Sequence, residues 1–579
     1  MNMQNRQTLL QQLKEKPTFS VVIVGGGING IGLYRELALQ GVDVLLVERD
    51  DFCAGASSAP SRMIHGGLRY LENAEYELVR ESLRERNRLL KNAPHYVSPL
   101  ATTIPIYSWF DGVWGSALRF LGLSDKPCNR GALVIKLGLW VYDVLTRSDQ
   151  VMPKHRFNSV KNTARSWLGI NPDLVCSATY YDAWISHPER LGLEMVLDVQ
   201  EQCDTALALN YMTLEDSDGA ELKLKDSRTG QDYNISGQIV VNAAGPWIDF
   251  TNQKMQHKTQ VIGGTKGSHL IVKNAALLAA LDGHMIYYEN KDGRVCILFP
   301  YFGNVLVGST DIKVQSPQDV TCTEEERSYI LQSLAGVFPD IEIKEQEIVF
   351  SFSGVRPLPS SKTATNGQIS RNHSIHILPP EGDRPYPVYS MIGGKWTTFR
   401  AFSEQLSDKL LLELKREKNQ SSEDLSIGGG KDYPVDQTQR DQWLTKFSQD
   451  SGLSLGRAET LLQRYGTKAR LLKDYCNNTD TPMQHHSHYS LGEIRFLICA
   501  ERVEKLLDIL LRRTSLAISG ELNLAMIEEI NQIMGDLKDW DQQQSDAELH
   551  STLNFLETNH GLDRMTLSNR TSYGAIEYV

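Results

Sequence analysis

"VVIVGGGINGIGLYRELALQGVDVLLVERD", residues 21–50, decides the fold of the first domain. An apolar run, a glycine-rich turn, a helical pattern and a second apolar run follow one another, which predicts a strand–turn–helix–strand unit. Gly25, Gly27 and Gly30 fit the spacing GxGxxG, whose glycines allow a tight turn, the approach of a pyrophosphate and close helix packing. Glu48 ends the second run, where a carboxylate can hold a ribose hydroxyl. This stretch predicts a dinucleotide site and leaves NAD and FAD open.

The composition bounds the class of protein. A chain of 579 residues is too long for one core, so we expect two or three domains. The formal net charge of −11 argues against nucleic-acid binding as the main task. The eight cysteines form no CxxC pair, so we expect neither a zinc site nor a disulfide framework, and a cytoplasmic location. Neither a signal peptide nor an apolar run of spanning length is evident.

Two further segments have the small residues that a bound ligand needs. "VVNAAGPWID", residues 240–249, ends a predicted strand with Ala244 and Gly245, where backbone can pass near a flat or phosphorylated ligand. "ASSAPSRMIHGGLRYLE", residues 56–72, combines small donors with an imidazole and two arginines, and such a loop can cradle phosphate. The alternatives are a tightly packed strand end and, for Arg69, a surface salt bridge. His65 is either a covalent flavin anchor or a packed, hydrogen-bonded histidine.

These motifs place the chain near a known family. With "KGSHLIV", "VGSTD", "SGVRPL", "ISRNHSI", "GGKWTTFR" and "LLRRT", which follow in the same order up to about residue 515, the sequence resembles the FAD-dependent glycerol-3-phosphate dehydrogenases on the glycine-oxidase-like flavoprotein fold. The resemblance implies FAD as cofactor. It also implies cofactor contacts at the following positions: Gly25, Gly27, Gly30, Glu48, Ser57, Ser58, His65, Gly66, Gly67, Ala244, Gly245, Gly394 and Thr397.

The resemblance also implies the domain organisation, an α/β plus α fold with three parts. We expect a Rossmann-like FAD-binding domain, an antiparallel-sheet substrate domain and a C-terminal helical cap. The predicted ranges are 18–100 with about 170–255 and 385–418 for the first, 101–169 with 256–384 for the second, and 430–545 for the third. Residues 546–579 are expected to form a loosely held polar tail.

A polyol phosphate would be the substrate of such an enzyme, and a dianion in an acidic protein needs local cations. We assign Arg69, Tyr70 and Arg371 to the phosphate, Lys395 to phosphate or flavin, and Thr310 to the substrate. Each of the cations alone can also be read as a surface charge. Arginine forks match phosphate oxygens in pairs.

Oxidation moves a hydride from carbon 2 to flavin N5 while the hydroxyl loses a proton, so a base must lie within hydrogen-bond reach. His269 in "KGSHL" is our candidate base, and Arg356 in "SGVRPL" is the candidate stabiliser of the developing alkoxide, since arginine stays protonated. The alternative for His269 is a hydrogen-bonded strand histidine.

One departure from the family pattern concerns the substrate. The family usually has Asp-Ala-Arg where this chain has Pro188-Glu189-Arg190, so a longer polyol phosphate such as a tetritol phosphate stays open. An amine or amino-acid oxidase of the same fold, which needs no phosphate cluster, is a second alternative, and a flavin-bearing binding protein without turnover is a third.

The remaining expectations concern partners. "IYSWFDGVWGSALRFLGLSDK", residues 106–126, is dense in large apolar residues and can sink one helical face into a bilayer, or else cover the substrate domain. The family implies a quinone acceptor and a peripheral position on the cytoplasmic face of the inner membrane. The apolar spacing in residues 493–514 predicts a packing face, within the chain or in a homodimer. No metal site is expected from His485, His486 and His488, which lack cysteines nearby.

Overall fold

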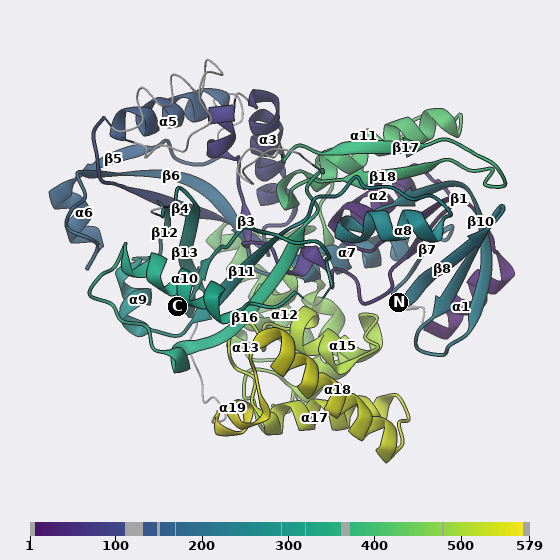
Figure 1. Cartoon of the computed structure of the whole chain (residues 1–579). Coiled ribbons are helices and arrows are strands. Elements are labelled where there is room, and N and C mark those ends of the chain that lie inside the picture. Colours follow the sequence, from purple (N-terminus) through teal and green to yellow (C-terminus); the bar gives the residue numbers. More distant parts are fainter. Residues whose placement is uncertain are drawn as a thin grey trace.

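The computed structural model describes residues 6–73, 75–110, 131–146, 151–167, 169–290, 292–318, 320–360, 371–476 and 480–570. Two large sheets lie side by side, and a group of helices from the last third of the chain packs beneath both (Figure 1). The predicted fold class, α/β plus α, is confirmed.

Sheet A is the Rossmann-like part. Its strands are β1 (Thr18–Val24), β2 (Val44–Val47), β7 (Ala206–Leu209), β8 (Met212–Asp218), β9 (Glu221–Asp226), β10 (Asp232–Asn242), β17 (Ser374–Leu378) and β18 (Val388–Ile392). Strands β18, β10, β1, β2 and β7 are parallel neighbours, with β1 in the middle. All four residues of β2 are buried, as expected for a parallel strand covered on both faces.

Helices cover both sheets and connect their strands. In the first two thirds of the chain these are α1 (Arg6–Glu15), α2 (Ile28–Leu39), α3 (Tyr76–Asn92), α5 (Ala132–Thr146), α6 (Val160–Ser166), α7 (Pro188–Gln202), α8 (Ile248–Lys254), α9 (Ala275–Ala280), α10 (Glu324–Ala335) and α11 (Phe399–Glu413). Helix α2 follows the glycine-rich turn and packs between α7 and α11. The turn therefore sits at the carboxyl end of β1, where ligands bind in open α/β sheets.

Sheet B is the second large sheet. Its strands are β3 (Met63–Ile64), β4 (Val97–Ile106), β5 (Arg156–Ser159), β6 (Cys176–Ile185), β11 (Thr265–Val272), β12 (Met285–Glu289), β13 (Val295–Tyr301), β14 (Asn304–Gly308), β15 (Ile312–Lys313) and β16 (Ile348–Arg356). Its pairs are antiparallel except β12 with β4. The expected antiparallel sheet is confirmed, and β11 lies in it between β14 and β16.

The C-terminal third is helical. It contains α12 (Gln437–Ser451), α13 (Leu455–Tyr465), α14 (Lys473–Cys476), α15 (Leu491–Ala500), α16 (Leu506–Asp508), a π-helical segment (Ile509–Arg513), α17 (Leu524–Leu537), α18 (Gln542–His560) and α19 (Arg564–Asn569). Phe496, Leu497, Val503 and Leu510 are buried inside the chain's own core, so the predicted apolar face of residues 493–514 packs intramolecularly.

One expectation about the C-terminus is wrong. Residues 546–579 were expected to form a loose tail, but residues up to 569 lie in α18 and α19. Leu553, Leu556 and Leu567 are buried against the C-terminal core. Three or four apolar positions on one face suffice to hold a helix whose other positions are polar.

Candidate functional site

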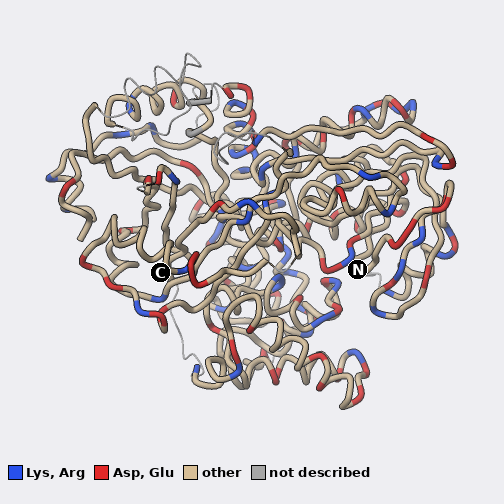
Figure 2. Tube along the Cα trace, in the orientation of Figure 1, with Lys and Arg blue, Asp and Glu red and all other residues tan. Residues whose placement is uncertain are grey.

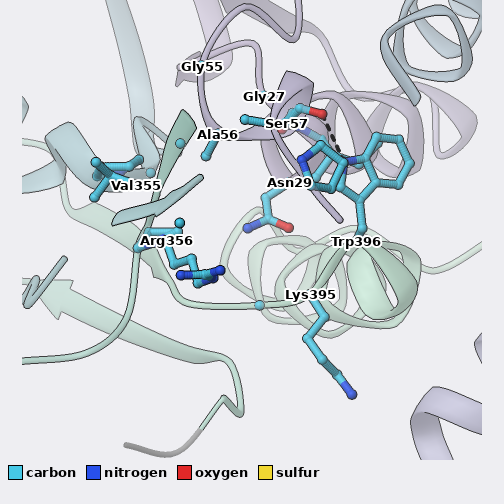
Figure 3. A pocket seen from close by; sticks show the side chains of 18 of the residues that line it. Gly27, Asn29, Gly55, Ala56, Ser57, Val355, Arg356, Lys395 and Trp396 are labelled. Carbon is cyan, nitrogen blue, oxygen red and sulfur yellow. Dashed lines mark hydrogen bonds between the residues drawn. The ribbon is translucent and has the colours of Figure 1, made fainter. Parts of the chain in front are cut away.

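A cavity of about 610 Å³ lies between the two sheets and takes its walls from both. Sheet A contributes the glycine-rich turn and Glu48, and sheet B contributes His269 and Arg356. The loop before β3 and the segment before α11 complete the walls with Ser57 and Lys395 (Figure 3). The cavity therefore joins the predicted dinucleotide turn to the predicted catalytic residues.

The glycine-rich turn has the geometry that its sequence predicts. Gly25 has φ +115°, and a methyl group there would lie 2.6 Å from the backbone of Ala243. A methyl group on Gly30 would lie 1.9 Å from the Gly25 carbonyl oxygen, so this glycine allows α2 to pack on the turn. Gly25 and Gly27 line the cavity, while Gly30 lies behind them. The N-terminus of α2, which follows this turn, is the kind of position at which phosphates bind in proteins.

Glu48 is held in place by backbone amides. Its two carboxylate oxygens accept hydrogen bonds from Gly26 N at 2.6 Å and Asp50 N at 2.9 Å. Burial and the neighbouring Asp50 raise its pKa to about 7, against the opposing effect of the two amides. Glu48 lines the cavity at the end of β2, in the position predicted for a ribose contact.

The serine-rich loop contributes differently at each position. Ser57 lines the cavity, and its hydroxyl accepts a hydrogen bond from Ile28 N, the start of α2, at 2.9 Å. Ser58, also expected to contact the cofactor, donates instead to the carbonyls of Ala54 and Gly55 and closes its own turn. That expectation is corrected: Ser58 shapes the loop rather than lining the cavity.

His65, Gly66 and Gly67 follow in the same loop. His65 and Gly67 line the cavity, and the amide of Gly66 donates to Asp182 at 3.0 Å from behind. Burial, then Lys395 and Arg371, lower the pKa of His65 to about 3, so its ring is neutral at physiological pH. A neutral, buried ring between two cations fits a packing role against a flat ligand.

The segment "GGKWTTFR" closes over the cavity at the start of α11. Gly394 has φ +95°, which lets the backbone pass close to Asn29. The Trp396 indole donates to the Ser57 carbonyl at 3.1 Å and ties the two loops together (Figure 3). The Thr397 hydroxyl accepts the amide of His65 at 3.2 Å. Ala244 and Gly245 line the cavity beside this segment.

Lys395 is a half-buried cation at the cavity wall. Its ammonium donates to the Ser82 hydroxyl at 2.6 Å and lies 4.4 Å from the centre of the Tyr70 ring. Burial lowers its pKa to about 7, although Glu81 and Asp182 favour the charged form. A bound anion would favour the charged form further.

His269 stands in the middle of β11. Its Nε2 is 2.9 Å from the Ser61 hydroxyl, and its ring stacks on Phe352 with centroids 4.9 Å apart. Burial, then Arg356 and Arg62, lower its pKa to about 3, so the ring is neutral. Its Nδ1 is buried without a hydrogen-bond partner, which marks this as an unsatisfied polar group beside the cavity.

Arg356 ends β16 and lies flat across Gly267, where a methyl group would meet the guanidinium at 2.1 Å. It donates to Asp311 at 3.2 Å, to the Ser309 hydroxyl at 3.1 Å and to the Thr310 carbonyl at 3.3 Å. Burial, then Arg371, lower its pKa to about 10, so it stays charged at neutral pH. Arg371 also lines the cavity, 3.8 Å from Asp311.

Two of the residues considered from the sequence, Thr310 and Lys266, have partners within the protein. The Thr310 hydroxyl donates to Glu326 at 2.6 Å and accepts from Ser268 N. Thr310 also lines the cavity, so its expected substrate contact stays a prediction. Lys266, one of the cations in the matching motifs, is bound to the same Glu326 at 2.6 Å. The side chain of Arg69 lies outside the described part of the chain, as do residues 111–126 of the apolar segment.

Several residues of the site had no signal of their own in the sequence. Ser61 holds His269, Ser82 holds Lys395, and Asp182 accepts hydrogen bonds from Gly66, Arg86 and Tyr142. Asp311 lies between Arg356 and Arg371. Each of these contacts joins residues 40 or more positions apart along the chain, so the quoted motifs that contain Ser61 and Asp311 do not reveal them.

Acidic and basic residues are otherwise interspersed along the trace (Figure 2). The cations at the cavity are therefore a local feature of an acidic protein. Within the described residues, no cluster of His, Cys, Asp or Glu has a metal-binding arrangement, and His486 is bound to Glu521 at 3.2 Å.

The glycine-rich turn after β1, Glu48 at the end of β2 and a cavity that leads to a second sheet are the features expected of a dinucleotide-binding oxidoreductase fold. The model of the FAD dependent oxidoreductase family matches residues 20–377, and that of the C-terminal domain of alpha-glycerophosphate oxidase matches residues 420–545. The chain is 31% identical to the glycerol-3-phosphate dehydrogenase of Synechocystis sp., over 94% of this chain and 97% of that protein.

Two other comparisons agree. The D-erythritol 1-phosphate dehydrogenase of Brucella abortus is 27% identical, over 87% of this chain and 95% of that protein. The FAD complex of the glycerol-3-phosphate dehydrogenase from Bacillus halodurans has the same fold, with a TM-score of 0.74, 22% identity and coverage of 97% and 98%. The chain belongs to the FAD-dependent oxidoreductases and, within them, to the glycerol-3-phosphate dehydrogenase family.

Proposed function

We propose that this enzyme oxidises sn-glycerol 3-phosphate to dihydroxyacetone phosphate and passes the electrons to a quinone. The observation that carries the proposal is the meeting of Arg356, Arg371, Lys395 and neutral His269 in one cavity with the dinucleotide turn. The names of the relatives support the same substrate class.

The residues of the cavity fit FAD. Gly25, Gly27 and the N-terminus of α2 would hold the pyrophosphate, and Glu48 would hold the adenosine ribose. Gly25 lets the turn pass against the backbone of Ala243, where a methyl group would lie 2.6 Å away, and this packing keeps the turn at the cavity wall. Ser57, His65, Gly67 and Gly394 would border the ring system.

The cationic wall would bind the phosphate. Arg371 and Lys395, with the ring of Tyr70 beneath Lys395, face the same cavity, and each lowers the pKa of His65. Arginine offers paired donors to phosphate oxygens, and Lys395 adds a point charge whose protonation a dianion favours. Arg356 is then free to face the reacting carbon.

The protein's task at carbon 2 is to take the hydroxyl proton and stabilise the oxygen. FAD, when bound, supplies the hydride acceptor. His269 is unprotonated at neutral pH and therefore able to accept the proton, and its Nδ1 has no other partner. Arg356 stays charged and stabilises negative charge that develops on the oxygen. Loss of the hydroxyl proton and of the carbon 2 hydride leaves the ketone.

A membrane contact would bring the enzyme to its quinone. Leu133, Leu137, Trp140 and Val144 recur at helical spacing on α5 and are each at least half exposed. Helix α5 lies at the outer edge of the molecule (Figure 1), and exposed Trp109 and Phe110 precede it in the chain. We propose that it rests on the cytoplasmic face of the inner membrane. No described helix has the length and hydropathy to cross a bilayer.

Anaerobic flavin reduction tests the substrate. Purified holoenzyme is mixed with sn-glycerol 3-phosphate, a tetritol phosphate, glycerol or an amino acid, and the flavin absorbance is followed. We expect the glycerol phosphate to bleach the flavin fastest and glycerol to leave it oxidised. Faster bleaching by the tetritol phosphate would replace the substrate within the class. Bleaching by glycerol or an amino acid, or by none of the four, would overturn the proposal.

A further inference from the structure

We propose that the C-terminal helical domain supports cofactor binding from outside the cavity, because its residues Arg512 and Arg513 clamp Asp51 in the loop that presents Glu48. The inference rests on the proposed placement of FAD, with its ribose at Glu48. It assigns a role in cofactor retention to a domain that does not line the cavity.

The clamp, defined as Asp51, Arg512 and Arg513, is fully formed and buried. Arg513 makes a two-pronged contact with the Asp51 carboxylate, with Nη1–Oδ2 at 2.6 Å and Nη2–Oδ1 at 3.0 Å. Arg512 Nε lies 2.6 Å from Asp51 Oδ2. Asp51 is 0% exposed, and Arg513 is 2% exposed. Paired guanidinium–carboxylate contacts fix orientation as well as distance.

Both arginines are held from within the C-terminal domain. Arg513 Nε donates to the Glu501 carbonyl at 2.9 Å, and Arg512 Nη2 donates to Asp508 at 2.6 Å. The π-helical segment Ile509–Arg513 brings the two consecutive side chains to the same carboxylate. A π-helical turn inside a helical region often marks a functional site.

The clamped loop is the wall of the cavity. Glu48, Arg49 and Asp50 line the cavity, and Asp51 follows directly. Cys53 N donates to the Gly26 carbonyl at 2.9 Å, while Gly26 N donates to Glu48. The loop therefore touches the glycine-rich turn on one side and the C-terminal arginines on the other.

Charge favours the clamped arrangement. Burial alone would raise the pKa of Asp51, but Arg513 and then Arg512 outweigh it and lower the pKa to about 2. Removing one arginine leaves a buried carboxylate short of a partner, which is strongly destabilising for the local arrangement. The loop would then leave the position in which Glu48 faces the ribose.

The affinity for FAD should fall when the loop leaves this position. If only a fraction of molecules keeps the binding-competent loop, the apparent dissociation constant rises by the inverse of that fraction. Because linkage is reciprocal, FAD should in turn hold the C-terminal arginines more firmly on Asp51.

The test measures FAD binding to the full chain without any substrate. Apoprotein of wild type, Arg513→Met, Arg513→Lys and Arg457→Met is titrated with FAD, and the fluorescence quenching gives the dissociation constant. Arg457 is the matched control, since it pairs with buried Glu493 inside the same domain, away from the loop. We expect Arg513→Met to raise the constant about tenfold or more, Arg513→Lys to raise it less, and Arg457→Met to change it by less than about twofold.

A second measurement covers a variant that fails to fold. Amide hydrogen exchange of residues 506–514 in the wild type should be slower with FAD than without it. An unchanged dissociation constant for FAD in folded Arg513→Met would overturn the inference. So would hydrogen exchange in residues 506–514 that FAD does not slow. Since no substrate is used, a failure of the proposed reaction leaves this result intact, and the reverse also holds.

Discussion

The two sides of the cavity are built in different ways. On the sheet A side, one continuous stretch of 30 residues forms a strand–turn–helix–strand unit. The backbone conformation of its glycine-rich turn makes the site. On the other side, His269 and Arg356 of sheet B meet two cations from separate segments, and these side chains make the site. The cations are Arg371, just before β17, and Lys395, just after β18. The first side should therefore be sensitive to any added atom, and the second to the charge and geometry of individual groups. Substitutions at four positions test this contrast.

The largest effect is expected at Gly30. A methyl group there meets the Gly25 carbonyl at 1.9 Å, so Gly30→Ala must push α2 from the turn, with strain of about 1–3 kcal/mol or more. We expect protein that purifies without flavin and without activity, read from the ratio of flavin to protein absorbance. Gly456→Ala is the control, since a methyl group there meets nothing within 4 Å. Normal flavin content in Gly30→Ala would contradict the backbone account of this side.

Arg356→Met should leave FAD in place and slow the chemistry. Loss of a preorganised charge at a developing oxyanion costs about 10²–10³ in kcat. Arg356→Lys should recover part of the rate, because the charge returns without the planar fork over Gly267. The check is kcat by dye reduction together with flavin content. An Arg356→Met enzyme with unchanged kcat and a raised KM would move Arg356 from the reacting oxygen to the phosphate.

Lys395 should set the alkaline limb of the pH profile. Its pKa of about 7 in the free enzyme means that the ammonium, present below pH 7, is lost as the pH rises through 7. Because kcat/KM reports groups of the free enzyme, it should fall above pH 7. Lys395→Arg should remove this fall, since arginine stays charged, and Lys395→Met should lower kcat/KM about tenfold without the fall. A wild-type profile that is flat from pH 6 to 9 would contradict the assignment.

Sequence reasoning predicts the first side better than the second for a physical reason. The roles of Gly25, Gly30 and Glu48 follow from local spacing after a strand, so the motif alone predicts them. The contact of Ser61 with His269 joins residues 208 positions apart and depends on sheet pairing. The sequence suggests that the Thr310 hydroxyl can bind substrate, because nothing in the sequence around Glu326 of α10 predicts that it accepts a hydrogen bond from this hydroxyl.

The C-terminal helices also show that contacts between distant segments are hard to predict from sequence. The polar composition of residues 542–560 hid the apolar spacing of Leu553 and Leu556, which become core residues only once the other helices provide a surface. The domain boundaries given from the sequence stay predictions, because elements of the last third contact both β16 of sheet B and α7 of the first domain. Composition reports the solvated majority of a helix, whereas packing depends on a few positions.

The smallest effect is expected at Ser61, and it separates positioning from binding on the sheet B side. Ser61→Ala removes the 2.9 Å contact that holds the His269 ring, worth about 0.5–1.5 kcal/mol, so kcat should fall about three- to tenfold while KM for the phosphate ester stays unchanged. Ser61→Thr keeps the hydroxyl and should stay near wild type. A rise in KM with unchanged kcat would show that Ser61 meets the phosphate instead. An equal fall in Ser61→Thr would show that loop shape, rather than the hydroxyl, orients His269.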